Sequence, residues 1–235
     1  MKPTFKHIKA FSKEELSKFK QCSDSQHLLS AFDLSRLRNI KLDNPSQSPS
    51  FKYFLDFGTR FGEGLEKIKG HEKLNKDVEI YSFEANPYTF QQISFKDDVE
   101  YYNIAVSAQD GFFNFNCEIQ DDGKPYGDGS SLMDIAYWNK EATYKPVGVF
   151  SMSIISLLDK LLPDRSEKSI LAKFDIEGME FDIFEELRKT DNFKWFSKIY
   201  VEFHQGNMDG KPLPTTDFEW MKYFEDIGLD VVLWN

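Results

Sequence analysis

The stretch that most constrains the fold is residues 53–64, which read YFLDFGTRFGEG. An apolar run leads into Asp56, and glycines follow at positions 58, 62 and 64, before a segment that can form a helix. An apolar strand, an acidic residue, a glycine turn and a helix are typical of the first βα unit of a doubly wound α/β domain. We therefore predict an α/β fold with a mostly parallel, doubly wound sheet and helices on both faces. A tight turn that binds no ligand is the alternative for this stretch alone.

The composition fits a large globular domain and excludes several classes of protein. The 235 residues are 40% hydrophobic and 16% aromatic, which is enough for a substantial core. A formal net charge of −10 argues against nucleic acid as the main partner. Cys22 and Cys117 belong to no C-x-x-C or Cys/His cluster, so we expect neither a disulfide framework nor a structural zinc site. With no signal-like segment and no run of 18 apolar residues, we expect a soluble, cytoplasmic protein without a membrane partner.

The chain is expected to divide between residues 50 and 51. Residues 12–15 have the form of a capping box, a second helix is expected at 26–37, and the polar, proline-containing residues 43–50 are typical of a linker. Residues 1–50 are therefore predicted to be an N-terminal helical extension, and residues 51–235 the main domain. The extension either caps a ligand cleft or serves packing alone.

The rest of the main domain shows alternating strand and helix patterns. Further strands are expected at residues 79–84, 169–176, 198–204 and 230–234, and residues 99–106 are expected to contain another strand and its exit. Helices are expected at residues 87–95, 153–160, 181–189 and 215–226. Residues 111–119 predict one more strand, at an edge or antiparallel. Residues 120–131 are rich in Gly, Asp and Ser and predict a loop, either a lid or a binding loop, which residues 137–146 are expected to continue over a cleft.

Polar side chains follow the predicted strands, at the edge where open parallel sheets bind ligands. They are Asp56, Glu84, Asn103, Asp175, Glu177, Glu202 and His204. Buried charges are costly unless they are paired or bound to a ligand, so this gathering predicts a binding site. Considered alone, Glu84 could equally be a solvated glutamate at a strand end, and His204 could equally be a structural histidine.

The early members of this set suit a cofactor. Asp56 could accept hydrogen bonds from a hydroxyl or ammonium group of a ligand. Glu84, at the end of the second strand, could accept from the vicinal hydroxyls of a ribose. An adenine ring could lie against the small side chain of Ala105, near Asn103.

The late members suit an acceptor. His204, with an unperturbed pKa of ~6.5, or Asp175 could act as a general base on a hydroxyl. Asp175 could instead join Glu202 and His204 in binding a divalent cation, although their spacing matches no recognised ligand motif.

Several short segments together carry a family resemblance. Residues 173–180 read KFDIEGME, and the segments SFEANP, NIAVS, SSL and VEFH begin at residues 82, 103, 130 and 201. With Asp56, Gly58 and Gly62, they resemble, in the right order, the motifs of the FkbM family of S-adenosylmethionine-dependent methyltransferases. The strongest similarity is to that family's K-x-D-x-E-G-x-E motif. The resemblance spans residues 51–235.

The resemblance implies a Rossmann-like class I methyltransferase fold and methyl transfer from S-adenosylmethionine, commonly to a hydroxyl of a sugar or small metabolite. It implies cofactor contacts from Asp56, Gly58, Thr59, Arg60, Gly62, Glu84, Ala85, Asn103 and Ala105. It implies acceptor contacts from Lys173, Glu177 and Ser130, with Asp175, Glu202 and His204 at the reaction centre. Thr59-Arg60 stands where the family usually has Ala-Asn, so the methionine end of the cofactor is expected to be held differently.

Two other functions remain open. One is a nucleotide-dependent oxidoreductase, which the glycine spacing disfavours because it does not match G-x-G-x-x-G. The other is a binding module of the same fold that has lost the methyl donor. The expected partner is a carbohydrate or small-molecule acceptor, and the sequence does not define an oligomeric state.

Overall fold

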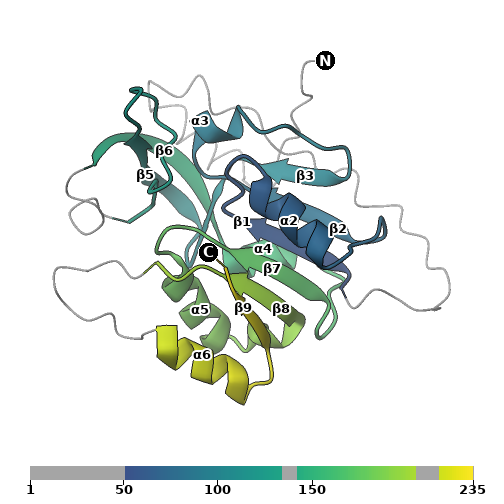
Figure 1. Cartoon of the computed structure of the whole chain (residues 1–235). Helices are drawn as coiled ribbons and strands as arrows, with labels where there is room; N and C mark the ends of the chain where they lie inside the picture. The colour runs from purple at the N-terminus through teal and green to yellow at the C-terminus, as the bar shows by residue number, and fades with distance from the viewer. Residues whose placement is uncertain (1–50, 134–141, 205–216, 235) are drawn as a thin grey trace, which may run out of the picture. The chain divides into compact units, whose positions relative to one another are not determined.

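Six parallel strands form the central sheet of this computed structural model, which describes residues 51–133, 142–204 and 217–234 (Figure 1). In spatial order they are β3 (Val99–Tyr102), β2 (Glu79–Phe83), β1 (Tyr53–Phe57), β7 (Ile170–Phe174), β8 (Phe196–Val201) and β9 (Asp230–Leu233). Every neighbouring pair is parallel. The order runs outward from β1 in one half and from β7 in the other, so the predicted Rossmann-like α/β fold is confirmed.

The strands are apolar because helices cover both faces of the sheet. All five residues of β1 and of β7 are buried. On one face, Phe54 and Leu171 pack with Leu65 and Ile68 of α2 (Glu63–His71). The opposite face is covered by α5 (Glu180–Lys189) and α6 (Asp217–Asp226).

Aromatic rings fill the core on the face covered by α5 and α6. The ring centroid of Phe174 in β7 lies 5.0 Å from that of Phe184 in α5. Phe184 in turn lies 5.4 Å from Trp220 and 5.3 Å from Phe224, both in α6. These rings join two helices to one strand.

The remaining helices in the described part of the chain are short. They are α3 (Pro87–Phe90), α4 (Ile154–Leu161) and the 3₁₀ helix η3 (Asn192–Trp195). The helix predicted for residues 87–95 ends early, at Phe90. The amides of Gln92 and Ile93 donate to carbonyls three residues back, as in a 3₁₀ turn, so the chain leaves the α-helical conformation there.

A second sheet stands beside the first and contains β4 (Ala105–Ser107), β6 (Thr143–Ser153) and β5 (Gly111–Ile119), in that order. β5 pairs with β6 in antiparallel register along its whole length, and β4 pairs with β6 in parallel. The antiparallel strand expected at residues 111–119 is therefore confirmed, although it lies outside the central sheet. The third strand and its exit, predicted for residues 99–106, are confirmed as β3 and the segment after Tyr102, and the chain then joins the second sheet at Ala105.

The continuation of the loop predicted for residues 137–146 is wrong at residues 143–146, because they belong to β6. Pro146 made this segment resemble a loop. At that position β6 has β5 beside it but not β4, which pairs only with residues 151–153. A missing N–H is tolerated on such an open side.

The predictions for residues 1–50, including the domain boundary, and for residues 137–141 lie outside the described residues. All described residues belong to one compact unit, Pro49–Asn235. Among their helices, none has the length and apolar character needed to span a bilayer.

Candidate active site

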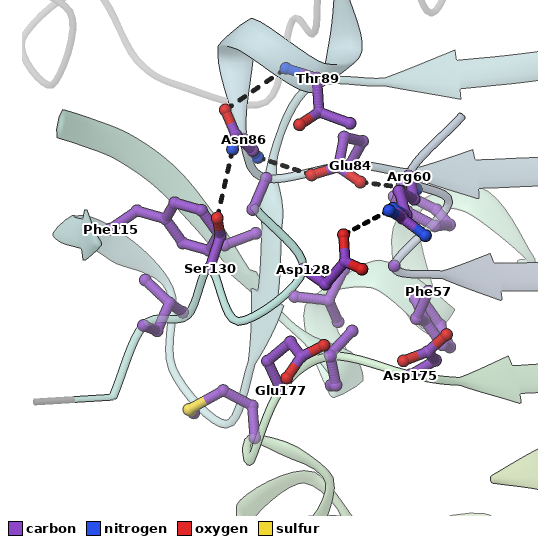
Figure 2. Close-up of a pocket in the computed structure, with 18 of the residues that line it drawn as sticks. Phe57, Arg60, Glu84, Asn86, Thr89, Phe115, Asp128, Ser130, Asp175 and Glu177 are labelled. Carbon is purple, nitrogen blue, oxygen red and sulfur yellow. Dashed lines mark hydrogen bonds and ion pairs between the residues drawn. The ribbon is translucent and has the colours of Figure 1, made fainter. Parts of the chain in front are cut away.

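A cavity of about 250 Å³ lies at the carboxyl ends of the central strands, where the strand order reverses between β1 and β7. Ligands of open parallel sheets bind at this place. Its polar lining includes Arg60, Glu84, Asn86, Asp128, Ser130, Asp175, Glu177 and Glu202. Its apolar lining includes Phe57, Phe83, Ala85, Ile104, Ala105, Val106, Phe115, Leu132, Ile176 and Met179. Figure 2 shows Glu84 and Arg60 on one side of the cavity and Asp175 and Glu177 on the other.

The turn after β1 brings the main chain of Gly58 against the end of β7. Gly58 has φ 78°, and a Cβ atom on it would lie 1.7 Å from the carbonyl oxygen of Asp175. No residue with a side chain fits there unless the backbone moves. Gly58 therefore permits the two strand ends to meet, and its main chain lines the cavity.

Glu84 is buried at the end of β2, and main-chain donors hold its carboxylate. Oε2 accepts from the N–H of Arg60 at 2.7 Å, and Oε1 accepts from the N–H of Asn86 at 2.8 Å (Figure 2). Burial raises the pKa of Glu84 to about 7, against the opposing effect of these two hydrogen bonds. The side chain of Asn103 supports the same turn by donating to the carbonyl of Glu84 at 2.7 Å. The acidic group is thus fixed in direction at the cavity wall.

Asn86 connects this turn to the loop at residues 120–131. Its side-chain oxygen caps α3 by accepting from the N–H of Tyr88 at 2.9 Å, and its amide donates to the carbonyl of Pro125 at 2.9 Å. Arg60 also reaches the loop through an ion pair with Asp128 (Figure 2). The loop therefore forms one wall of the cavity and is anchored to both β1 and β2.

A buried charge network lies beneath the cavity. The ammonium group of Lys173 donates to the carbonyl of Gly58 at 2.7 Å and lies 3.0 Å from Oδ2 of Asp175 and 3.6 Å from Oδ1 of Asp56. Burial acts to lower the pKa of Lys173, but the two aspartates outweigh it and raise the pKa above its usual value. Thr59 donates to Oδ2 of Asp56 at 2.7 Å. This network fixes the end of β1 against the end of β7.

A second charged cluster surrounds His204, beyond the end of β8. Nδ1 lies 3.0 Å from Oε1 of Glu180. Nε2 lies 3.5 Å from Oε2 of Glu177, 3.6 Å from Oε1 of Glu202 and 3.9 Å from Oδ1 of Asp175. The sequence predicted three of these carboxylates, and the structure brings them together around one imidazole.

The pKa values of three members of the cluster, Glu177, Glu202 and His204, are raised. Burial raises the pKa of Glu177 to about 8, against the opposing effect of His204. Burial acts to lower the pKa of His204, but the hydrogen bond to Glu180 and the nearby carboxylates raise it to about 9. Burial and the charge of Asp175 also raise the pKa of Glu202.

Three members of the same cluster lie close enough together to hold a metal ion. Asp175, Glu177 and His204 each offer one ligand atom, and these atoms lie within 4.8 Å of one another. Carboxylate oxygen and imidazole nitrogen together suit several divalent cations. The predicted set differed in naming Glu202 where the geometry has Glu177.

The comparison with known families connects this site to a reaction class. The profile of the methyltransferase FkbM domain matches residues 56–229, from the end of β1 to the residue before β9. The chain belongs to the FkbM methyltransferase family. No curated protein and no solved structure gave a significant match.

The site residues predicted from the sequence fall into two groups, those that line the cavity and those that lie outside its lining. Those that line the cavity are Gly58, Arg60, Glu84, Ala85, Ala105, Ser130, Asp175, Glu177 and Glu202. Those outside the lining are Asp56, Thr59, Gly62, Asn103, Lys173 and His204. Asp56, Thr59 and Lys173 are buried, so their side chains are placed to support the cavity wall. Contact with cofactor or acceptor remains a prediction for every member of both groups.

Sequence reasoning missed several residues of the FkbM site. Asn86 was readable as the cap of a helix that begins with Pro87, but nothing local indicated its bond to Pro125. Asp128 lies among other polar loop residues, and nothing in the sequence around it indicated that it pairs with Arg60. Phe115 resembled any core residue of a strand. The role of Glu180 was hidden because its partners depend on the tertiary structure.

Proposed function

We propose that this FkbM-family protein transfers a methyl group from S-adenosylmethionine to a hydroxyl group of a carbohydrate or small metabolite. Two observations support the proposal. The chain belongs to a methyltransferase family. Its cavity lies at the reversal of strand order and has an acidic residue from the end of β2 in its wall.

The residues around the cavity fit this cofactor. The carboxylate of Glu84 is the kind of acceptor that ribose hydroxyls need. The small and apolar side chains of Ala85, Ile104 and Ala105 make a wall against which an adenine ring can lie. Gly58 lets a ligand approach the main chain closely. When bound, S-adenosylmethionine would supply the methyl group as a reactive sulfonium.

The opposite wall suits the acceptor. The carboxylates of Asp175, Glu177 and Glu202 line the cavity and can accept hydrogen bonds from hydroxyl groups. We assign the base to Asp175, since it lines the cavity whereas His204 does not, so that an oxygen of its carboxylate takes the hydroxyl proton. Orientation of the acceptor is expected to contribute most of the rate acceleration.

Glu84 at the cavity wall is the observation that carries the proposal, and calorimetry tests it. Titration with S-adenosylhomocysteine should show micromolar binding, and Glu84→Ala should weaken it tenfold or more, which is roughly 1.4 kcal/mol. Glu63→Ala removes an exposed carboxylate from α2 and should bind like the natural protein. Circular dichroism checks that each variant folds, because Glu84 also holds two main-chain donors.

The outcomes separate the alternatives. If the natural protein does not bind S-adenosylhomocysteine, the methyl-donor assignment is wrong and a binding module without the donor becomes the better proposal. Binding that Glu84→Ala leaves unchanged would place the cofactor elsewhere. Once a cofactor site is established, a mass increase of one methyl group on an acceptor excludes the inactive module.

A further inference from the structure

Glu180, the first residue of α5, is a completely buried carboxylate that meets three polar groups. Oε1 accepts from the N–H of Ile176 at 2.8 Å, and Oε2 accepts from the N–H of Gly178 at 2.9 Å. Nδ1 of His204 lies 3.0 Å from Oε1. A buried carboxylate is tolerated only when it is paired and hydrogen-bonded, and these contacts meet that requirement.

The contact of Glu180 with His204 is not needed to satisfy the free main-chain N–H groups at the start of α5. The two main-chain bonds close the turn between β7 and α5, a local role that any capping carboxylate can fill. His204 comes from a different segment, after the end of β8. Glu180 therefore joins the turn that carries Glu177 to the segment that carries Glu202 and His204.

The contact of His204 Nδ1 with Glu180 determines the direction in which Nε2 of the same ring points. Nε2 faces the carboxylates of Asp175, Glu177 and Glu202, at 3.9, 3.5 and 3.6 Å. All three line the cavity. When an acceptor holds one nitrogen of a histidine, the ring orientation is fixed, and the second nitrogen is presented in a defined direction.

We infer that Glu180 is a positioning residue, which holds His204 so that Nε2 lies among the three carboxylates of the cavity wall. Glu180 does not reach the cavity itself and acts through His204. Its consequence for methyl transfer rests on the proposed function. The contact between Glu180 and His204 can be tested without it.

Nuclear magnetic resonance of the ring nitrogens provides that test. The natural protein should show a low-field ring N–H signal that is assigned to His204 because His204→Asn removes it. Glu180→Gln keeps the shape of the side chain but removes its charge, so the signal should move upfield or disappear. Asp182→Asn, in the first turn of the same helix, should leave it in place. A signal that persists unchanged in Glu180→Gln would overturn the inference.

A second measurement covers the case in which Glu180→Gln fails to fold. The carboxylate carbon of Glu180 should shift in His204→Asn, in which both main-chain partners of Glu180 remain. An unchanged carbon signal would overturn the inference as surely. Neither measurement needs a cofactor, so failure to bind S-adenosylhomocysteine would count against the proposed function alone.

The functional consequence is measured by turnover once an acceptor is known. Glu180→Gln should lower kcat about tenfold or more while its affinity for S-adenosylhomocysteine stays that of the natural protein. Because Glu180 acts through His204, the double variant with His204→Asn should be no slower than His204→Asn alone. Additive losses would show that Glu180 acts independently of His204.

Discussion

The ammonium nitrogen of Lys173 lies 3.0 Å from Oδ2 of Asp175 and 2.7 Å from the carbonyl oxygen of Gly58, in a position that is almost completely buried. One side chain thus holds the turn after β1, in the cofactor half of the proposed site, to the carboxylate in the acceptor half. Sequence reasoning assigned Lys173 to acceptor binding, whereas the structure places it beneath the cavity wall.

Replacing this lysine should destabilise the fold strongly. Lys173→Met leaves the fully buried Asp56 and the partly buried Asp175 without their cation, so the free energy of unfolding should fall by about 3–5 kcal/mol. Urea denaturation followed by tryptophan fluorescence measures this. Lys124→Met breaks an exposed pair with Asp122 and should lower the free energy of unfolding far less, because water screens exposed charges. If the two variants are equally stable, the buried network does not have the role we give it.

The two glycines of the turn after β1 should respond differently to alanine. Gly58→Ala places a Cβ atom 1.7 Å from the carbonyl oxygen of Asp175, so the strand ends must separate. Gly62, with φ 94°, has no atom within 4 Å of such a Cβ, and Gly62→Ala should cost only the backbone strain, about 1–3 kcal/mol. We expect Gly58→Ala to lose clearly more unfolding free energy than Gly62→Ala by denaturation. The reverse order would mean that the β1 and β7 ends are not in contact.

Glu84 should make stability depend on pH in a defined direction. Its pKa of about 7 in the folded protein exceeds the ordinary value of 4.5, so the folded state keeps a proton that the unfolded chain releases. The stabilising contribution of Glu84 is complete at a pH below its ordinary pKa of 4.5. It is lost as the pH rises through the pKa of about 7 in the folded protein. The unfolding free energy of the natural protein minus that of Glu84→Gln should therefore fall between about pH 5 and pH 8, by about 3 kcal/mol at most.

Denaturation series on both proteins over this pH range provide the measurement. Taking the difference removes the contributions of Glu177 and His204, whose pKa values are also raised. A difference that does not change with pH would show that the Glu84 carboxyl titrates normally.

The central sheet and the edge where the site lies could both be predicted from the sequence alone. Largely apolar runs before Asp56, Glu84 and Asp175, alternating with helix patterns, predicted parallel strands, because strands buried on both faces are mostly apolar. The carboxyl ends of parallel strands meet at one edge, so the residues just past each strand could be expected to lie near one another. The glycine at position 58 and the order of family motifs pointed to the same edge.

How those residues divide between the cavity wall and the layer behind it depends on the tertiary structure. Lys173 and Asp175 are two positions apart, yet one is buried beneath the wall and the other lines it. The second sheet, the bond from Asn86 to Pro125 and the contact of Glu180 with His204 all join segments far apart in the chain. Such contacts leave no periodic signal, because local patterns report which side of an element is buried and not what packs against it.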